Sequence, residues 1–124
     1  MSKEKNKQLI KKLHHIWNTG DINLVSEVYS ENIIVNWARG WGLPSKGLKE
    51  VEQTILKTRS VFHNWNEEIL DLVVDDDKVT SRYISTGVHK EEYLGVPASG
   101  KNIEFQEISI YLIRDNKVLE QWCL

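Results

Sequence analysis

The sequence contains a single cysteine, Cys123, among its 124 residues. One thiol cannot form an internal disulfide, and we expect this residue to be a small apolar side chain near the end of the last strand rather than a reactive group. With nothing that indicates an oxidising compartment, the default expectation is a cytoplasmic location.

The sequence also lacks a long apolar run and a concentrated basic patch. No apolar stretch approaches the roughly 20 residues of a membrane-spanning helix, and charged residues at the N-terminus lead directly into an amphipathic pattern, without the apolar segment of a secretory signal. Lys and Arg number 16 against 18 Asp and Glu, and they are scattered except for a cluster at the N-terminus that is typical of a solvated helix face. We therefore expect no membrane partner and no nucleic-acid partner.

Tryptophan, in contrast, is plentiful, and the five copies are Trp17, Trp37, Trp41, Trp65 and Trp122. Each is a large, rigid apolar group with one polar N–H, so these residues could fill a core, line a pocket or form a dimer interface. The length and the 40% hydrophobic content fit one domain over residues 1–124.

Helical periodicity dominates the first half of the chain. Apolar side chains recur at helical spacing over residues 4–18, and Gly20 is expected to end this helix. Asp21 is the expected N-cap of a short second helix. Ser45 is the expected cap of a third helix, whose apolar stripe covers residues 48–62.

The second half of the chain is rich in predicted strands. One predicted strand, residues 33–37, lies in the first half, and the others cover residues 67–74, 79–89, 102–114 and 117–122. Residues 75–78 predict a solvated turn and lack the Gly and later Glu of a calcium-binding loop, so no metal site is expected. Helices followed by strands predict an α+β fold with an antiparallel sheet covered on one side.

Two strands raise questions of side-chain direction. In a regular strand 79–89, Tyr83 and His89 share one face and Arg82 lies on the other, unless Gly87 marks a bulge. Arg82 could bind an anionic ligand, or form an ion pair with a carboxylate such as Glu120.

The strand 102–114 changes its alternation. Ile103 and Phe105 are apolar at odd positions, whereas Ile108, Ile110 and Leu112 are apolar at even positions. This change predicts a bulge near Gln106-Glu107.

An ordered set of short motifs runs through the second half of the chain. It comprises Arg82, Gly87-Val88-His89, the loop Glu92–Pro97, Gly100-Lys101 and Glu120-Gln121-Trp122. This set resembles the SnoaL-like polyketide cyclases of the NTF2-like superfamily, whose pattern is Arg, Gly-Thr-His, aromatic-x-Gly-x-Pro, Gly-Lys and Glu-x-Trp. The resemblance implies a cone in which N-terminal helices pack on a curved antiparallel or mixed sheet.

The resemblance also implies a function. A cyclase of this family takes up a small apolar molecule with a carbonyl group and, without a cofactor, catalyses cyclisation or isomerisation by proton transfer. The alternative is a ligand-binding or interaction module without catalysis. An epoxide-hydrolase type of reaction would need paired carboxylates and an Arg that we do not locate.

Two residues are candidates for the acid/base group. The family typically places an Asp a few residues after the Trp, and neither residue after Trp122 is Asp, so we expect weak or absent cyclase activity unless another group substitutes. His89 is a candidate because histidine is the side chain whose unperturbed pKa lies near neutrality, although His89 could equally be a structural histidine that anchors the next loop. Glu107 either faces a polar cavity or is simply solvated.

The candidate ligand-binding residues are mostly aromatic. They are Trp17, Asn36, Trp37, Trp41, Tyr83, Tyr93 and Trp122. Asn36 could donate a hydrogen bond to an enolate, or it could be a turn-forming residue. If Ile108, Ile110 and Leu112 face outward, they would leave an apolar patch in water, which predicts a homodimer through that sheet face.

Overall fold

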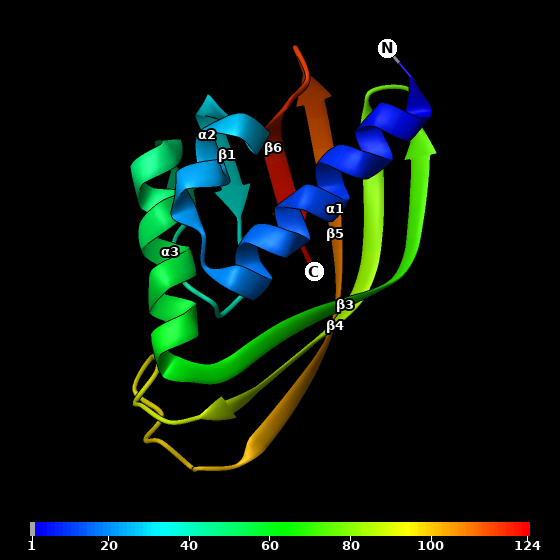
Figure 1. Cartoon of the computed structure of the whole chain (residues 1–124). Coiled ribbons are helices and arrows are strands. Elements are labelled where there is room, and N and C mark those ends of the chain that lie inside the picture. Colours follow the sequence, from blue (N-terminus) through cyan, green and yellow to red (C-terminus); the bar gives the residue numbers. More distant parts are fainter. Residues whose placement is uncertain (1) are drawn as a thin grey trace.

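The structure is a computed structural model that describes residues 2–124 as helices packed on a curved sheet (Figure 1). Its elements are α1 (Lys3–Thr19), the 3₁₀ turn η1 (Ile22–Leu24), α2 (Val25–Val28), β1 (Tyr29–Asn36), β2 (Ser45–Lys46), α3 (Gly47–Val61), β3 (Phe62–Asp75), β4 (Lys78–His89), β5 (Asn102–Arg114) and β6 (Lys117–Cys123). The predicted α+β class is confirmed.

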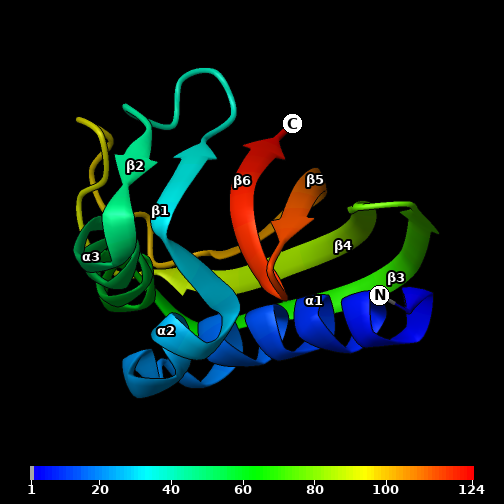
Figure 2. The ribbon, with the colours of Figure 1, turned by 90° about the horizontal axis from the view of Figure 1, so that it is seen from above.

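The six strands form one mixed sheet in the order β2-β1-β6-β5-β4-β3. The β1–β6 pair is parallel and the other pairs are antiparallel. Figure 2 shows the sheet curving above α1, while α3 contacts both β1 and β3. The result is an open NTF2-like cone with its helices on the concave side. Within residues 2–124, no helix is long and apolar enough to cross a membrane.

Helix α1 lies where the helical spacing of apolar residues predicted it. The Ser2 hydroxyl accepts a hydrogen bond from the Lys5 amide at its start, and Gly20 ends it in the left-handed region at φ 76°. Ile10, Leu13 and Trp17 bury one face against the sheet. This face orients the whole helix, including the polar residues that share it.

The two other predicted caps had different outcomes. Asp21 caps η1 by accepting a hydrogen bond from the Asn23 amide, as expected. Ser45 is not a cap: it lies in β2, and its hydroxyl accepts a hydrogen bond from Trp37 Nε1 at 2.9 Å. Lys46 precedes α3 without a side-chain capping bond, and Phe62 begins β3 rather than continuing the helix.

A bulge does occur beside Gly87, but in the neighbouring strand. Gly87 pairs regularly with Ile103 of β5, whereas the β3–β4 register shifts between His63 and Asn66. A Cβ at position 87 would lie 3.0 Å from Phe62 Cβ. The glycine therefore leaves room for the side chains that the bulge turns inward.

The bulge predicted near Gln106-Glu107 is wrong. The β4–β5 register continues without a break, with Glu107 opposite Tyr83. The apolar positions change parity because Phe105 packs on the concave side, whereas Ile108 lies on the convex side and is 38% exposed. One regular strand thus carries apolar residues on opposite faces at its two ends.

Arg82 lies on the convex side of β4, as strand parity predicted. Its Nε donates a hydrogen bond to Asp71 Oδ2 at 2.8 Å, across the β3–β4 pair. The expected ion pair therefore exists, but its partner is Asp71 and not Glu120.

Candidate active site

A cavity of about 420 Å³ opens on the concave side of the sheet. Nine aromatic residues contribute to its lining: Trp17, Trp37, Trp41, Phe62, Trp65, Tyr83, Tyr93, Phe105 and Tyr111. Its charged lining residues are Glu67, Glu104 and Glu107. An apolar wall with a few polar groups is typical of a small-molecule site.

Most of the predicted site residues meet at this cavity. Its lining includes Trp17, Trp37, Trp41, Tyr83, Tyr93 and Glu107, and it does not include Asn36, His89 or Trp122. The structure gives the position of each side chain, and the ligand-binding and catalytic roles of all nine residues stay predictions.

Asn36 and Trp122 lie beside each other where β1 pairs with β6. Asn36 Nδ2 donates hydrogen bonds to Glu120 Oε2 at 3.0 Å and to the Gln121 carbonyl oxygen at 3.2 Å. Trp122 alternates with Gln121 and Cys123, which both line the cavity, so its side chain lies on the convex face. The side chains of Asn36 and Trp122 therefore do not enter the cavity.

His89 lies behind the aromatic wall. Its ring centroid is 5.3 Å from that of Phe62, and its Nδ1 is 3.5 Å from Ser99 Oγ. Its backbone pairs with the far end of the following loop, through Gly100 and Lys101. Its Nε2 is buried and has no hydrogen-bond partner within residues 2–124. These contacts are those expected of a histidine that anchors the loop.

Glu107 is a partly buried carboxylate of the cavity wall. Tyr83, opposite it on β4, donates a hydrogen bond to Glu107 Oε2 at 3.3 Å. The Tyr83 hydroxyl also lies 2.9 Å from Ser109 Oγ. No ion pair of Glu107 occurs within the described chain. A negative charge on Glu107 is therefore stabilised mainly by hydroxyl groups.

Burial sets the protonation of both members of this pair. It raises the pKa of the Glu107 carboxyl, and the neighbouring hydroxyls of Ser85 and Tyr83 only partly oppose this effect. Burial also raises the pKa of the Tyr83 phenol well above its ordinary value. Tyr83 is therefore a neutral hydrogen-bond donor at physiological pH, beside a carboxyl that holds its proton more tightly than usual.

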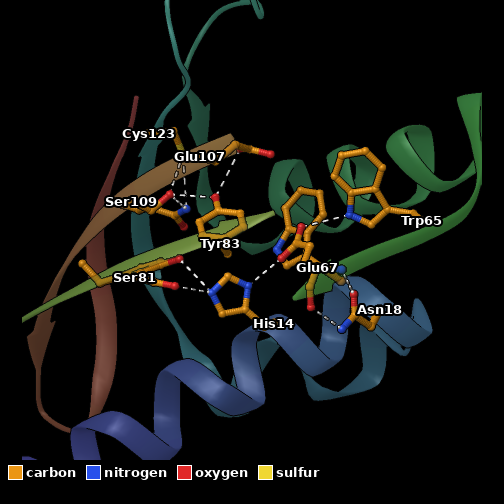
Figure 3. A network of polar contacts seen from close by, with 12 residues as sticks. His14, Asn18, Trp65, Glu67, Ser81, Tyr83, Glu107, Ser109 and Cys123 are labelled. Atoms are coloured by element: carbon orange, nitrogen blue, oxygen red, sulfur yellow. Dashed lines mark hydrogen bonds and ion pairs between the residues drawn. The ribbon is translucent and has the colours of Figure 1, made fainter. Parts of the chain in front are cut away.

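A second carboxylate, Glu67, is held in a buried network (Figure 3). His14 Nδ1 lies 2.6 Å from Glu67 Oε1, and Trp65 Nε1 donates to Glu67 Oε2 at 2.9 Å. Asn18 accepts from the Glu67 amide and donates to its carbonyl oxygen. His14 Nε2 lies 2.9 Å from Ser81 Oγ. Both carboxylate oxygens are therefore occupied by protein donors.

Sequence reasoning missed this network, although one signal was available. His14 shares the buried face of α1 with Ile10, Leu13 and Trp17. A histidine on such a face needs a buried partner. The partner, Glu67, lies 53 residues away on β3, and its inward direction depends on the bulge before it, which the sequence pattern did not predict.

Cys123 also lines the cavity, but it is not a ready nucleophile. Burial raises the pKa of its thiol to about 12. Its sulfur accepts from Ser109 Oγ at 3.4 Å and from Gln121 Nε2 at 3.3 Å. The prediction of a small buried residue at the end of the last strand fits this position.

Comparison with known proteins identifies the family. The SnoaL-like polyketide cyclase family matches residues 7–124. Similar structures include IdmH of Streptomyces antibioticus, a candidate polyketide cyclase, which is 22% identical with a TM-score of 0.82 over 95% of this chain and 89% of that one. TsrD of Streptomyces laurentii is also 22% identical, with a TM-score of 0.88 over 100% and 90%.

A candidate polyketide cyclase from Bacillus cereus is 26% identical, with a TM-score of 0.80 over 100% of this chain and 78% of that one. Comparison with curated proteins gave no match. The family match covers nearly the whole chain, and the open cone with its aromatic cavity agrees with it. The chain therefore belongs to the SnoaL-like polyketide cyclase family.

Proposed function

We propose that this protein catalyses cofactor-free proton transfer next to a carbonyl group of a small apolar molecule, leading to cyclisation or isomerisation. One observation carries the proposal: the Glu107 carboxylate lies in the wall of an aromatic cavity, beside a neutral Tyr83 and without an ion-pair partner in the described chain. A base of this kind is matched to a carbon acid because its raised pKa lies closer to working pH.

Glu107 and Tyr83 would act in turn. The ionised Glu107 removes a proton from the carbon beside the carbonyl and becomes a neutral acid. A neutral carboxyl accepts hydrogen bonds less strongly, so the Tyr83 hydroxyl can donate to the developing enolate oxygen. The cavity holds the enolate for ring closure or for return of the proton at another carbon.

Glu67 is a poor candidate for the base, because both of its oxygens accept hydrogen bonds from the protein. Within residues 2–124, this leaves Glu107 as the partly buried carboxylate of the cavity without a basic partner, since Glu104 is exposed. It also keeps the second function open, namely a module that binds its ligand in the same cavity without turnover. The hydrogen bonds to Glu67 favour this alternative, because they leave the site without a second free carboxylate to return the proton.

Exchange of carbon-bound protons tests the proposed step without knowledge of the substrate. The probe is 2-tetralone in D₂O, followed by proton NMR at the carbons next to its carbonyl. We expect Glu107→Gln to lower the catalysed rate at least about 100-fold, the loss typical for removal of a general base. The matched control is Glu68→Gln, the same change at an exposed residue of β3, and it should leave the rate unchanged.

The same assay decides between the candidates. Loss of exchange in His89→Ala, with Glu107→Gln still active, would move the base to His89. Binding of the ketone by the wild type without any exchange would establish the non-catalytic module instead.

We also propose a homodimer through the convex sheet face. Ile108 is 38% exposed there, and Ile110 pairs with Trp122 on the same surface. Helices α1, α2 and α3 lie on the opposite side of the sheet (Figure 2). Light scattering should give a dimer mass at micromolar concentration, and Ile108→Glu should shift it to the monomer. A monomer mass for the wild type would contradict the proposal.

Location in the cytoplasm stays a prediction.

A further inference from the structure

We infer that the cavity selects an organic cation, so that the ligand of this site carries a protonated amine or quaternary ammonium group in addition to its carbonyl. The inference rests on the proposed function only in placing the ligand in the same cavity. It follows from the charge of the wall, from one buried acceptor that lacks a partner and from the position of the aromatic rings.

The charge of the cavity wall has one sign. Three glutamates line it, and within residues 2–124 no Lys, Arg or His does. Both carboxylate oxygens of Glu67 already have protein partners, His14 Nδ1 and Trp65 Nε1, and Glu104 is exposed to solvent. Glu107 is neither paired nor fully solvated. A cationic ligand would supply the charge that the protein does not provide there.

One buried acceptor of the cavity wall has no hydrogen-bond partner among the described residues. Gln121 is only 3% exposed and lines the cavity, yet its Oε1 has no hydrogen-bond partner in residues 2–124. Its Nε2 is already used toward Ser109 and Cys123. An anionic ligand would meet the carboxylate of Glu107 with no basic residue to balance it, and such an uncompensated charge is costly in a partly dry site.

Aromatic rings lie next to this carboxylate. Phe105 and Glu107 are two residues apart on the concave face of β5, so their side chains are neighbours. The Trp41 ring centroid is 4.9 Å from that of Phe105 and 5.8 Å from that of Tyr93. A cation beside these rings gains from their negative faces while it approaches the carboxylate.

A pair of ligands with the same shape tests the inference. Acetylcholine carries a carbonyl and a quaternary ammonium group, and 3,3-dimethylbutyl acetate has carbon in place of the charged nitrogen. Titration is followed by tryptophan fluorescence, because four of the five tryptophans line the cavity. We expect acetylcholine to bind at least about tenfold more tightly than the neutral ester, the preference expected of a partly desolvated cation–π and charge contact.

Variants assign the preference to the residues named. Glu107→Gln and Phe105→Leu should each reduce the ratio of the two affinities, and Glu68→Gln should leave it unchanged. Equal affinities in the wild type, tighter binding of the neutral ester, or no binding of acetylcholine would each overturn the inference.

The outcome is separable from that of the proposed function. Exchange of 2-tetralone protons without a preference for the cation would retain the proposed catalysis and remove the inference. A preference for the cation without any exchange would do the reverse.

Discussion

His14 Nδ1 lies 2.6 Å from Glu67 Oε1, and this buried contact joins helix α1 to strand β3 beside the cavity. Figure 3 shows His14 reaching from α1 to Glu67 on one side and to Ser81 on the other. The contact fixes α1 against the part of β3 that carries Trp65. The buried polar contacts of His14 and Glu67 therefore hold together the two elements that border the cavity.

Removal of the Glu67 carboxylate should therefore strongly destabilise the fold. Glu67→Ala deprives Trp65 Nε1 of its acceptor and His14 Nδ1 of its partner, and breaking a buried pair of this kind typically costs about 3–5 kcal/mol. Urea unfolding measures the change in the free energy of unfolding. Glu68→Ala, at the adjacent exposed position, is the control and should stay within about 0.5 kcal/mol of the wild type. Equal losses in the two variants would contradict the structural role.

Glu107 should destabilise the fold at neutral pH. Its pKa is raised in the folded state, so the folded protein binds the proton more tightly than the unfolded chain, and the free energy of unfolding falls as pH rises through the range between the two pKa values. Below the ordinary carboxyl pKa both states are protonated and the penalty disappears.

The variant Glu107→Gln isolates this effect. We expect it to be more stable than the wild type in urea at pH 7, with the advantage shrinking as the pH approaches 4. Glu67 raises the pKa of Glu107 and His14 lowers it, so both are left in place. A stability difference that does not change with pH would show that the carboxyl is not perturbed.

Cys123 should be unreactive in the native protein. With a thiol pKa of about 12, almost no thiolate is present at pH 8, where an exposed cysteine is partly ionised. Iodoacetamide should label the folded protein at least about a hundredfold more slowly than the chain in denaturing urea. Mass spectrometry after timed quenching gives the two rates. Comparable rates would mean that the thiol is accessible and ionised.

The elements that depend on local periodicity could be predicted from the sequence. The bounds of β5, Asn102–Arg114, agree with the predicted strand, and α1 differs from the predicted range by one residue at each end. Gly20 and Asp21 have the capping roles that their chemistry indicates, because the partners of a cap lie within a few residues.

Features that depend on distant partners could not be predicted in this way. The Ser45 hydroxyl accepts a hydrogen bond from Trp37 Nε1 and lies 3.0 Å from Thr54 Oγ1 in the middle of α3, so it is not available to cap the first turn of that helix. The bulge of β3 at residues 63–66 places Asn64 in the left-handed region at φ 60°. An Asn alone does not mark a bulge, because asparagine adopts this conformation in turns as well. The register shift lies opposite Gly87 of β4, which is a distant partner. The direction of Glu67, and with it the buried network, follows from that bulge.

The dependence of proton exchange on pH tests the central claim most directly, because it reports the group that removes the proton. For wild type with 2-tetralone, the rate should rise with pH and level off above a pKa higher than that of an ordinary carboxyl, since Glu107 acts only when ionised and burial raises its pKa. In Glu107→Gln this titration should vanish together with the catalysed rate. A wild-type profile that is retained in Glu107→Gln would contradict the account and assign the base to another residue.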